Sequence, residues 1–202
     1  MTRAILLVAA VLFGSVLAQS VTWTGKAHGY KGTPAELWTN LDRYENPDAA
    51  IKIGTIDADG RFSFALPTVV PNEVLAAPDV REDCGDFTLG LKLAVLATVN
   101  LRQDDRPIGQ MFFSNRRATL EQMAAGQLEG GSKFVLWFYA NRAGTLKENC
   151  KTDNYQQISD VTFVQGWNAV MGYFYKNGDG LVLRIRNGYT EGLQRWFYLP
   201  SS

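Results

Sequence analysis

The chain reads as an all-β protein: an antiparallel β-sandwich with a transthyretin-like N-terminal part, extended by a C-terminal antiparallel meander and carrying one short helix. Three observations predict this. Apolar residues alternate with polar ones in most segments, glycine-containing turns separate those segments, and only one stretch lacks alternation while being rich in helix formers.

The clearest local signal is the segment 53–67, where two alternating runs flank Asp59-Gly60. An Asp-Gly pair supplies the positive backbone dihedrals of a tight turn. Phe62, Phe64 and Leu66 then share one face of the second strand. This segment is predicted to be a β-hairpin.

Two further strands precede the hairpin. Residues 21–30 alternate, with Trp23 and Ala27 on one side, and residues 35–41 alternate after a turn that contains Pro34. Together with the hairpin they form a predicted four-stranded unit.

The residues of this unit resemble those of the carboxypeptidase-regulatory-like domains of the transthyretin-like β-sandwich group. The resemblance covers residues 21–67 and rests on three pieces, which are 21–27, 32–37 and 55–67. It implies a small antiparallel sandwich used as a structural or binding accessory, and it implies no catalytic residue.

The second half continues the β pattern. Residues 72–88 are predicted to be a connection, and a possible subdivision of the domain lies near residues 68–88. Residues 118–127 are predicted to be the short helix. The predicted strands of this half are 89–101 as one long central strand, then 107–113, 134–140, 161–165, 168–175, 181–186 and 194–199.

The N-terminus predicts export. Arg3 is followed by about fourteen apolar residues and by Val16-Leu17-Ala18, which is a basic region, a hydrophobic core and a small-residue cleavage signal. We expect residues 1–18 to be a signal peptide and 19–202 to be one secreted domain, in the periplasm, the cell envelope or the extracellular space. No later stretch reaches the ~20 apolar residues of a membrane-spanning helix.

Two cysteines are present, Cys84 and Cys150. In an oxidising compartment an isolated pair is expected to form one disulfide, with two buried free thiols or half of a metal site as the alternatives. The chain has 20 basic and 20 acidic residues, so no net field favours nucleic acid as a partner.

A single histidine, His28, limits the chemistry. Catalytic triads and zinc or copper sites need partners that one imidazole cannot supply, so we expect His28 at the surface, no cofactor and no metal. A metal-dependent redox sandwich of the copper superoxide dismutase type is the enzymatic alternative, and the single histidine disfavours it.

Aromatic and arginine residues gather on one predicted face of the C-terminal strands. Tyr, Trp and Arg are favoured at protein interfaces, and such faces also bind sugars. We therefore expect a non-enzymatic module that binds or assembles with another envelope or extracellular protein, with glycan binding as an alternative. The predicted binding residues are Trp137, Tyr139, Tyr173, Tyr175, Arg184, Arg186, Trp196 and Tyr198. The other possibility left open is that this face is covered by the short helix or by the N-terminal sheet.

Overall fold

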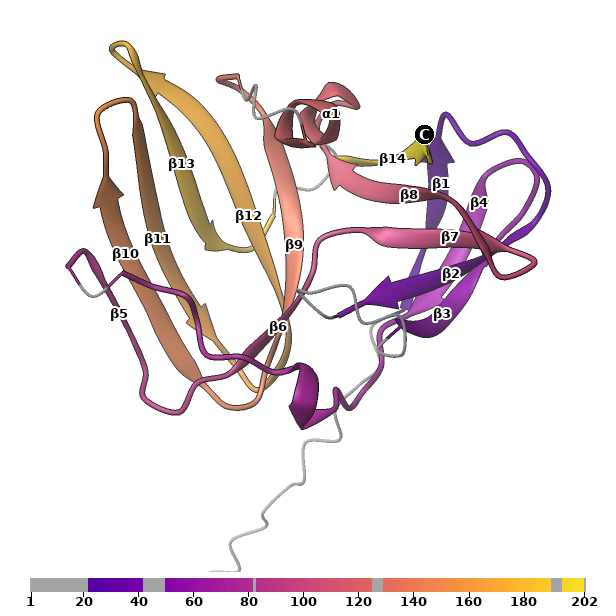
Figure 1. Cartoon of the computed structure of the whole chain (residues 1–202). Coiled ribbons are helices and arrows are strands. Elements are labelled where there is room, and N and C mark those ends of the chain that lie inside the picture. Colours follow the sequence, from indigo (N-terminus) through magenta and orange to yellow (C-terminus); the bar gives the residue numbers. More distant parts are fainter. Residues whose placement is uncertain (1–21, 42–49, 82, 125–128, 190–193, 202) are drawn as a thin grey trace, which may run out of the picture.

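The structure is a computed structural model that describes residues 22–41, 50–81, 83–124, 129–189 and 194–201. The predicted signal peptide, residues 1–18, lies outside this part. Within it the fold is nearly all β, which confirms the predicted class (Figure 1). The strands are β1 (Thr22–His28), β2 (Ala35–Asn40), β3 (Ala50–Ile56), β4 (Arg61–Ala65), β5 (Gly85–Phe87), β6 (Leu93–Leu96), β7 (Val99–Gln103), β8 (Arg106–Ser114), β9 (Lys133–Ala140), β10 (Gly144–Lys151), β11 (Tyr155–Phe163), β12 (Gly166–Asn177), β13 (Gly180–Asn187) and β14 (Arg195–Pro200). The helices are the 3₁₀ turn η2 (Asn72–Val74) and α1 (Ala118–Ala124), the latter where the sequence predicted a helix.

Seven strands close into a barrel. Their order is β14-β1-β4-β3-β2-β7-β8, and β8 pairs again with β14 to complete the ring. The β1–β14 pair is parallel, whereas the other pairs of the ring are antiparallel. A closed ring leaves no edge strand with unpaired backbone groups.

The predicted hairpin at Asp59-Gly60 joins β3 to β4 in this barrel. Gly60 has φ +82°, and the Asp57 carboxylate accepts hydrogen bonds from the backbone N–H groups of Asp59 and Arg61 at 2.9 and 2.8 Å. Asp57 therefore stabilises its own turn. Phe62 and Phe64 are buried on the inner side, as their alternation predicted.

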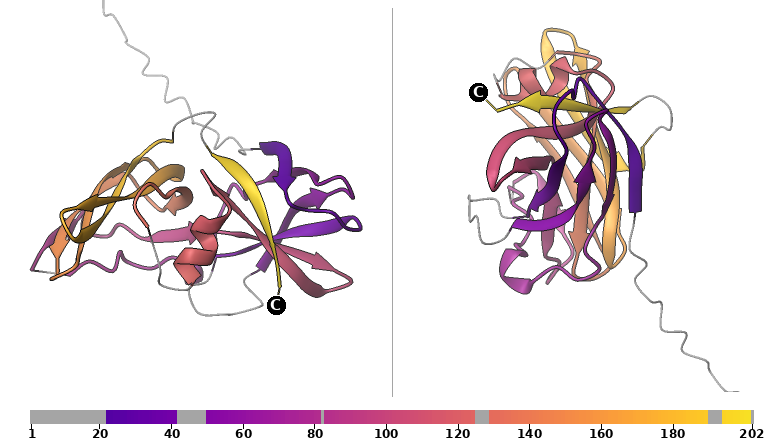
Figure 2. Two further views of the ribbon diagram at one scale, coloured as in Figure 1. Left: turned by 90° about the horizontal axis from the view of Figure 1, so that it is seen from above. Right: turned by 90° about the vertical axis from the view of Figure 1, so that its right-hand side faces the viewer.

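The remaining strands form an open sheet beside the barrel, in the order β9-β12-β13-β11-β10-β5, with β6 on the other side of β9. Figure 2 (left) shows the barrel and this curved sheet side by side. The hairpins β10–β11 and β12–β13 are antiparallel, but β11 and β13 pair in parallel, so these strands are not a simple up-and-down series.

The barrel and the open sheet, which we call the two bodies of the molecule, belong to one hydrogen-bonded sheet, because β8 also pairs with β9. The predicted single strand 89–101 is instead two strands, because β6 pairs with β9 of the open sheet while β7 pairs with β2 and β8 of the barrel. The chain thus changes sheets at residues 97–98. Two further strands were not predicted from the sequence. No strand was expected at β10, and the residues of β5 were predicted to belong to the connection 72–88.

Buried side chains follow this division. The largest cluster fills the barrel and the junction with β9, and it includes Leu37, Leu101, Met111, Trp137 and Trp196. Two smaller clusters lie on one side of the open sheet, one around Phe163 and the other around Phe174. We call the side of the open sheet that carries these two clusters its inner side.

Candidate functional site

Two of the predicted binding residues are core residues. Trp137 on β9 and Trp196 on β14 are 3% and 5% exposed, and their rings stack with centroids 5.2 Å apart and an interplanar angle of 3°. Trp196 also contacts Phe64 and Phe113 edge-on or tilted, at 5.4 and 5.2 Å. The expectation that both tryptophans face a partner is wrong, because β9 lies against the barrel and buries this side of the strand.

Two other predicted residues also serve the fold. Tyr139 on β9 packs edge-on against Trp167 at 5.5 Å, and the Trp167 indole N–H donates to the Pro67 carbonyl at 2.7 Å. This contact joins β12 to the loop that follows β4. Tyr198 donates its hydroxyl hydrogen bond to the Ile108 carbonyl at 2.6 Å, which ties β14 to β8.

The other four predicted residues lie together on the outer side of the open sheet, opposite the two small clusters. We call them the Tyr/Arg face, which consists of Tyr173, Tyr175, Arg184 and Arg186. Tyr173 stacks on Tyr175 with centroids 5.7 Å apart, and the Arg186 guanidinium lies 5.5 Å from the centre of the Tyr173 ring. Tyr173 and Arg184 are direct partners in the β12–β13 ladder. Both arginines are exposed and both tyrosines are half-buried.

The register of the sheet adds charged neighbours that sequence reasoning missed. Side chains of paired residues lie on the same side of a sheet. The ladders therefore place Lys133 beside Tyr173, Asp160 beside Arg186, Lys147 beside Asp160, Lys151 on the same side of β10, and Asp86 beside Lys147. Recognising β10 as a strand would have been needed to find Lys147 and Lys151.

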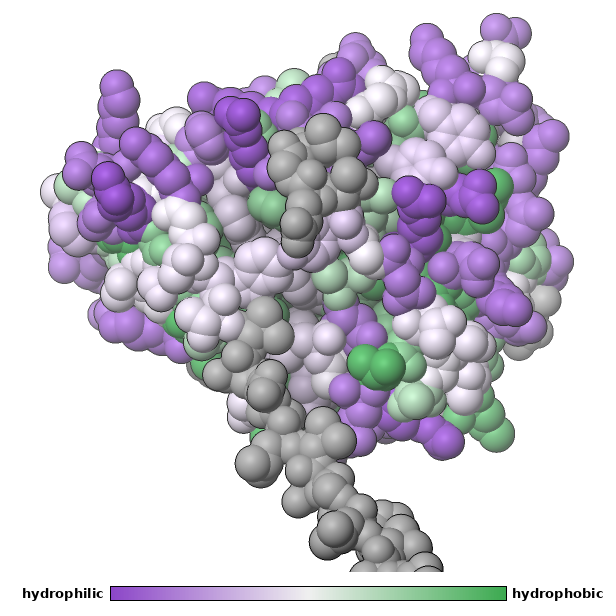
Figure 3. Space-filling view, turned by 180° about the vertical axis from the view of Figure 1, so that it is seen from behind, coloured by the Kyte–Doolittle hydropathy of each residue, from purple (hydrophilic) through white to green (hydrophobic). Residues whose placement is uncertain are grey.

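On the surface seen from behind, hydrophilic residues gather toward the edges, the middle is of intermediate hydropathy, and the hydrophobic areas are small and separate (Figure 3). Large hydrophobic side chains that are exposed are few in the described ranges and well separated in sequence: Val69, Leu89, Val164 and Tyr189. A binding site on this protein would therefore depend on aromatic and charged groups more than on a broad apolar patch.

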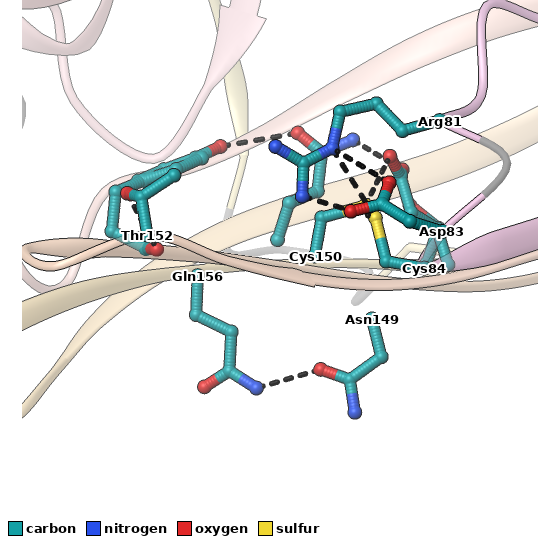
Figure 4. The surroundings of a disulfide bond; sticks show 11 residues. Arg81, Asp83, Cys84, Asn149, Cys150, Thr152 and Gln156 are labelled. Atoms are coloured by element: carbon teal, nitrogen blue, oxygen red, sulfur yellow. Dashed lines mark hydrogen bonds and ion pairs between the residues drawn. A yellow bond between two sulfur atoms is a disulfide. The ribbon is translucent and has the colours of Figure 1, made fainter.

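The disulfide Cys84–Cys150 is present and attaches the segment before β5 to β10 (Figure 4). Arg81 approaches Cys84 with its Nη2 atom 3.3 Å from the sulfur. Figure 4 also shows Asn149 and Gln156, which are hydrogen-bonded at 2.7 Å, on the opposite side of the sheet from the disulfide. The disulfide therefore lies on the inner side, away from the Tyr/Arg face.

One group of potential metal ligands occurs in the part of the chain that the structure describes, namely Cys84, Glu148 and Cys150. Both sulfurs are engaged in the disulfide, which removes the thiolates that a metal would need. The Glu148 carboxylate accepts hydrogen bonds from Gln157 and Ser159, at 2.5 and 3.2 Å. This group supplies one carboxylate, and that carboxylate is already hydrogen-bonded.

The inner side next to Glu148 carries Tyr155, whose hydroxyl donates to Gln157 at 3.1 Å. Burial, and secondarily the negative charge of Glu148, raise the pKa of Tyr155 above its ordinary value. His28 is exposed on the barrel wall, as predicted, with its ring 5.7 Å from Phe197.

No family model, curated protein or solved structure matched this chain. The resemblance of residues 21–67 to the transthyretin-like group therefore stays a prediction. In the described residues, none of the helices has the length and apolar character needed to cross a membrane.

Proposed function

We propose that the chain is an exported binding or assembly module that captures another envelope or extracellular protein through the Tyr/Arg face. The observation that carries the proposal is the position of Tyr173, Tyr175, Arg184 and Arg186 opposite the clusters around Phe163 and Phe174, with both arginines exposed. Tyr and Arg are enriched among the residues that dominate binding energy at protein interfaces.

The arrangement favours a protein over a glycan. A sugar platform needs a free aromatic ring face. Tyr173 is instead stacked with Tyr175, and Arg186 also lies over its ring. These contacts hold the side chains in place before a partner arrives, which lowers the entropy lost on binding.

Export is supported by the disulfide, which forms in oxidising compartments, together with the signal-like sequence of residues 1–18. We expect the mature protein to begin at Gln19. N-terminal sequencing of the exported protein checks this, and retention of Met1 in the exported form would contradict it.

The binding role is tested by site-specific photocrosslinking in the native host. A photoreactive phenylalanine analogue replaces Tyr175 in one variant and exposed Lys26, on the barrel wall, in a matched control. We expect position 175 to give a discrete protein adduct that mass spectrometry identifies, and position 26 to give none. Absence of an adduct at 175, or the same adducts at both positions, would contradict the proposal.

A further inference from the structure

The outer side of the open sheet is locally basic although the whole chain has no net charge. Its strands carry five basic side chains and two acidic ones by the register of the ladders. The basic residues are Lys133, Lys147, Lys151, Arg184 and Arg186, and the acidic ones are Asp86 and Asp160. A surface with this excess attracts groups of negative charge.

The positive charges of Arg184 and Arg186, on β13 in the middle of the open sheet, are not paired with a negative charge in the described residues. No ion pair between described residues includes Arg184 or Arg186. Asp160 is the ladder partner of Arg186, yet the two side chains do not form an ion pair within 4.0 Å. The guanidinium of Arg186 is directed over Tyr173 instead. Both guanidinium groups therefore keep their donors available for a carboxylate of another molecule.

The spacing of these arginines matches an extended peptide. Arg184 and Arg186 lie two residues apart on β13, a distance of roughly 6.8 Å along a strand. Side chains at every second residue of an extended partner segment have the same separation. The tyrosines stand on the adjacent strand, roughly 4.8 Å to the side, where they can contact the same segment.

We infer that the partner docks on the Tyr/Arg face through an extended segment whose carboxylates occur at alternate residues. The inference rests on the proposed function and specifies the chemistry of its partner. Two carboxylates of the segment pair with Arg184 and Arg186, and the rings of Tyr173 and Tyr175 pack against the stems of the acidic side chains. Lys133, Lys147 and Lys151 add long-range attraction around this contact.

Two synthetic peptides of identical composition test the spacing. One repeats Glu-Thr four times, and the other repeats Glu-Glu-Thr-Thr twice, so that only the first has acidic residues two positions apart. Binding to the full mature chain is measured by fluorescence anisotropy of labelled peptides. We expect the alternating peptide to bind about tenfold more tightly or better, and its affinity to fall as salt increases.

Matched variants assign the binding to the face. R184E/R186E is expected to weaken binding of the alternating peptide by about tenfold or more. R61E/R106E makes the same charge change at two exposed positions of the barrel and should leave binding close to that of the parent protein. Thermal unfolding of both variants verifies that the fold is retained.

Three results would overturn the inference: neither peptide binds, both bind equally, or R61E/R106E is as damaging as R184E/R186E. Tighter binding of a sulfated oligosaccharide than of the alternating peptide would also overturn it and assign the face to a glycan. These outcomes are separate from the photocrosslinking result. A protein adduct at position 175 without a preference for alternating acids would leave the proposed function intact while removing this inference.

Discussion

The barrel and the outer side of the open sheet use aromatic residues in different ways. In the barrel, rings from β1, β4, β8 and β14 point inward and meet Trp137 of β9 in one continuous cluster. In the open sheet, Tyr173 and Tyr175 point outward beside two arginines. The phenylalanines on the inner side of the open sheet are buried in its own clusters, so the contrast concerns the half-buried Tyr173 and Tyr175 on its outer side.

This difference arises because the barrel is a closed sheet, whereas the second sheet is open. A barrel turns one side of every strand toward a common interior, and large side chains are needed to fill it. An open sheet has two sides, and here the inner side carries two buried clusters, while on the outer side Val135 and Trp137 of β9 join the core cluster of the barrel. Tyr and Trp in alternating strands consequently indicate an interface only when the partner strands of the sheet are known.

The largest expected effect concerns the joint between the two bodies. Trp196→Ala removes a ring that packs against Phe62, Phe64 and Trp137. We expect a loss of about 3–5 kcal/mol in the free energy of unfolding, because the cavity left by a buried tryptophan cannot close fully. Chemical denaturation of the purified variant measures this loss.

Trp38→Ala is the matched control on the barrel wall. Trp38 is half-buried and lies beside Arg102, whose guanidinium is 4.9 Å from the ring centre. Its removal should cost clearly less than the removal of Trp196. Equal losses would show that the aromatic cluster at the joint does not hold the two bodies together more strongly than an ordinary surface contact.

A more localised effect, of similar or smaller size, is expected from the disulfide, which joins two segments of the open sheet. Cys84 and Cys150 are 66 residues apart in sequence, for which the chain-entropy estimate is about 4 kcal/mol as an upper expectation. Hydrogen exchange of C84S/C150S should show lost protection in β5 and β10 before any loss in β1 or β4. Simultaneous loss in the barrel strands would mean that the two bodies unfold as one unit.

The smallest expected effect is a pH dependence on the inner side of the open sheet. The pKa of Tyr155 is raised in the folded protein, so the unfolded chain loses this proton at a lower pH than the folded chain. The contribution of Tyr155 to stability should be unchanged by pH below about pH 10, the ordinary tyrosine pKa, and should turn unfavourable above it. Denaturation between about pH 9 and 11 measures the slope, which should be shallower in Tyr155→Phe; an unchanged slope would exclude Tyr155 as its source.

The sequence predicted the fold best where pairing is local. The β3–β4 hairpin carries its own turn chemistry in Asp57, Asp59 and Gly60, and α1 interrupts the alternation as expected. The division of 89–101 into β6 and β7 could not be predicted, because it depends on which distant strands lie beside each half. β10 was not predicted, because its polar residues, among them Lys147, Asn149 and Lys151, hide the alternation of apolar and polar residues that indicates a strand.

In the candidate site too, neighbours within one hairpin could be predicted from the sequence, and contacts between distant strands could not. Alternation along single strands placed Tyr173 with Tyr175 and Arg184 with Arg186, and the hairpin loop between them made them neighbours. It could not show that Trp137 and Trp196 face each other, since that contact joins two bodies through strands 59 residues apart. Long-range pairing therefore decided which aromatic residues were accessible.

The parallel pairing of β1 with β14 joins the first described strand to the last one. During synthesis or translocation, β1 has to wait for residues 195–200 before its second neighbour exists. Closing so long a stretch of chain is slow, since the entropy is lost before the contacts form. Until then β1 and β8 both lack the backbone partner that β14 provides, and the barrel stays open between these two strands.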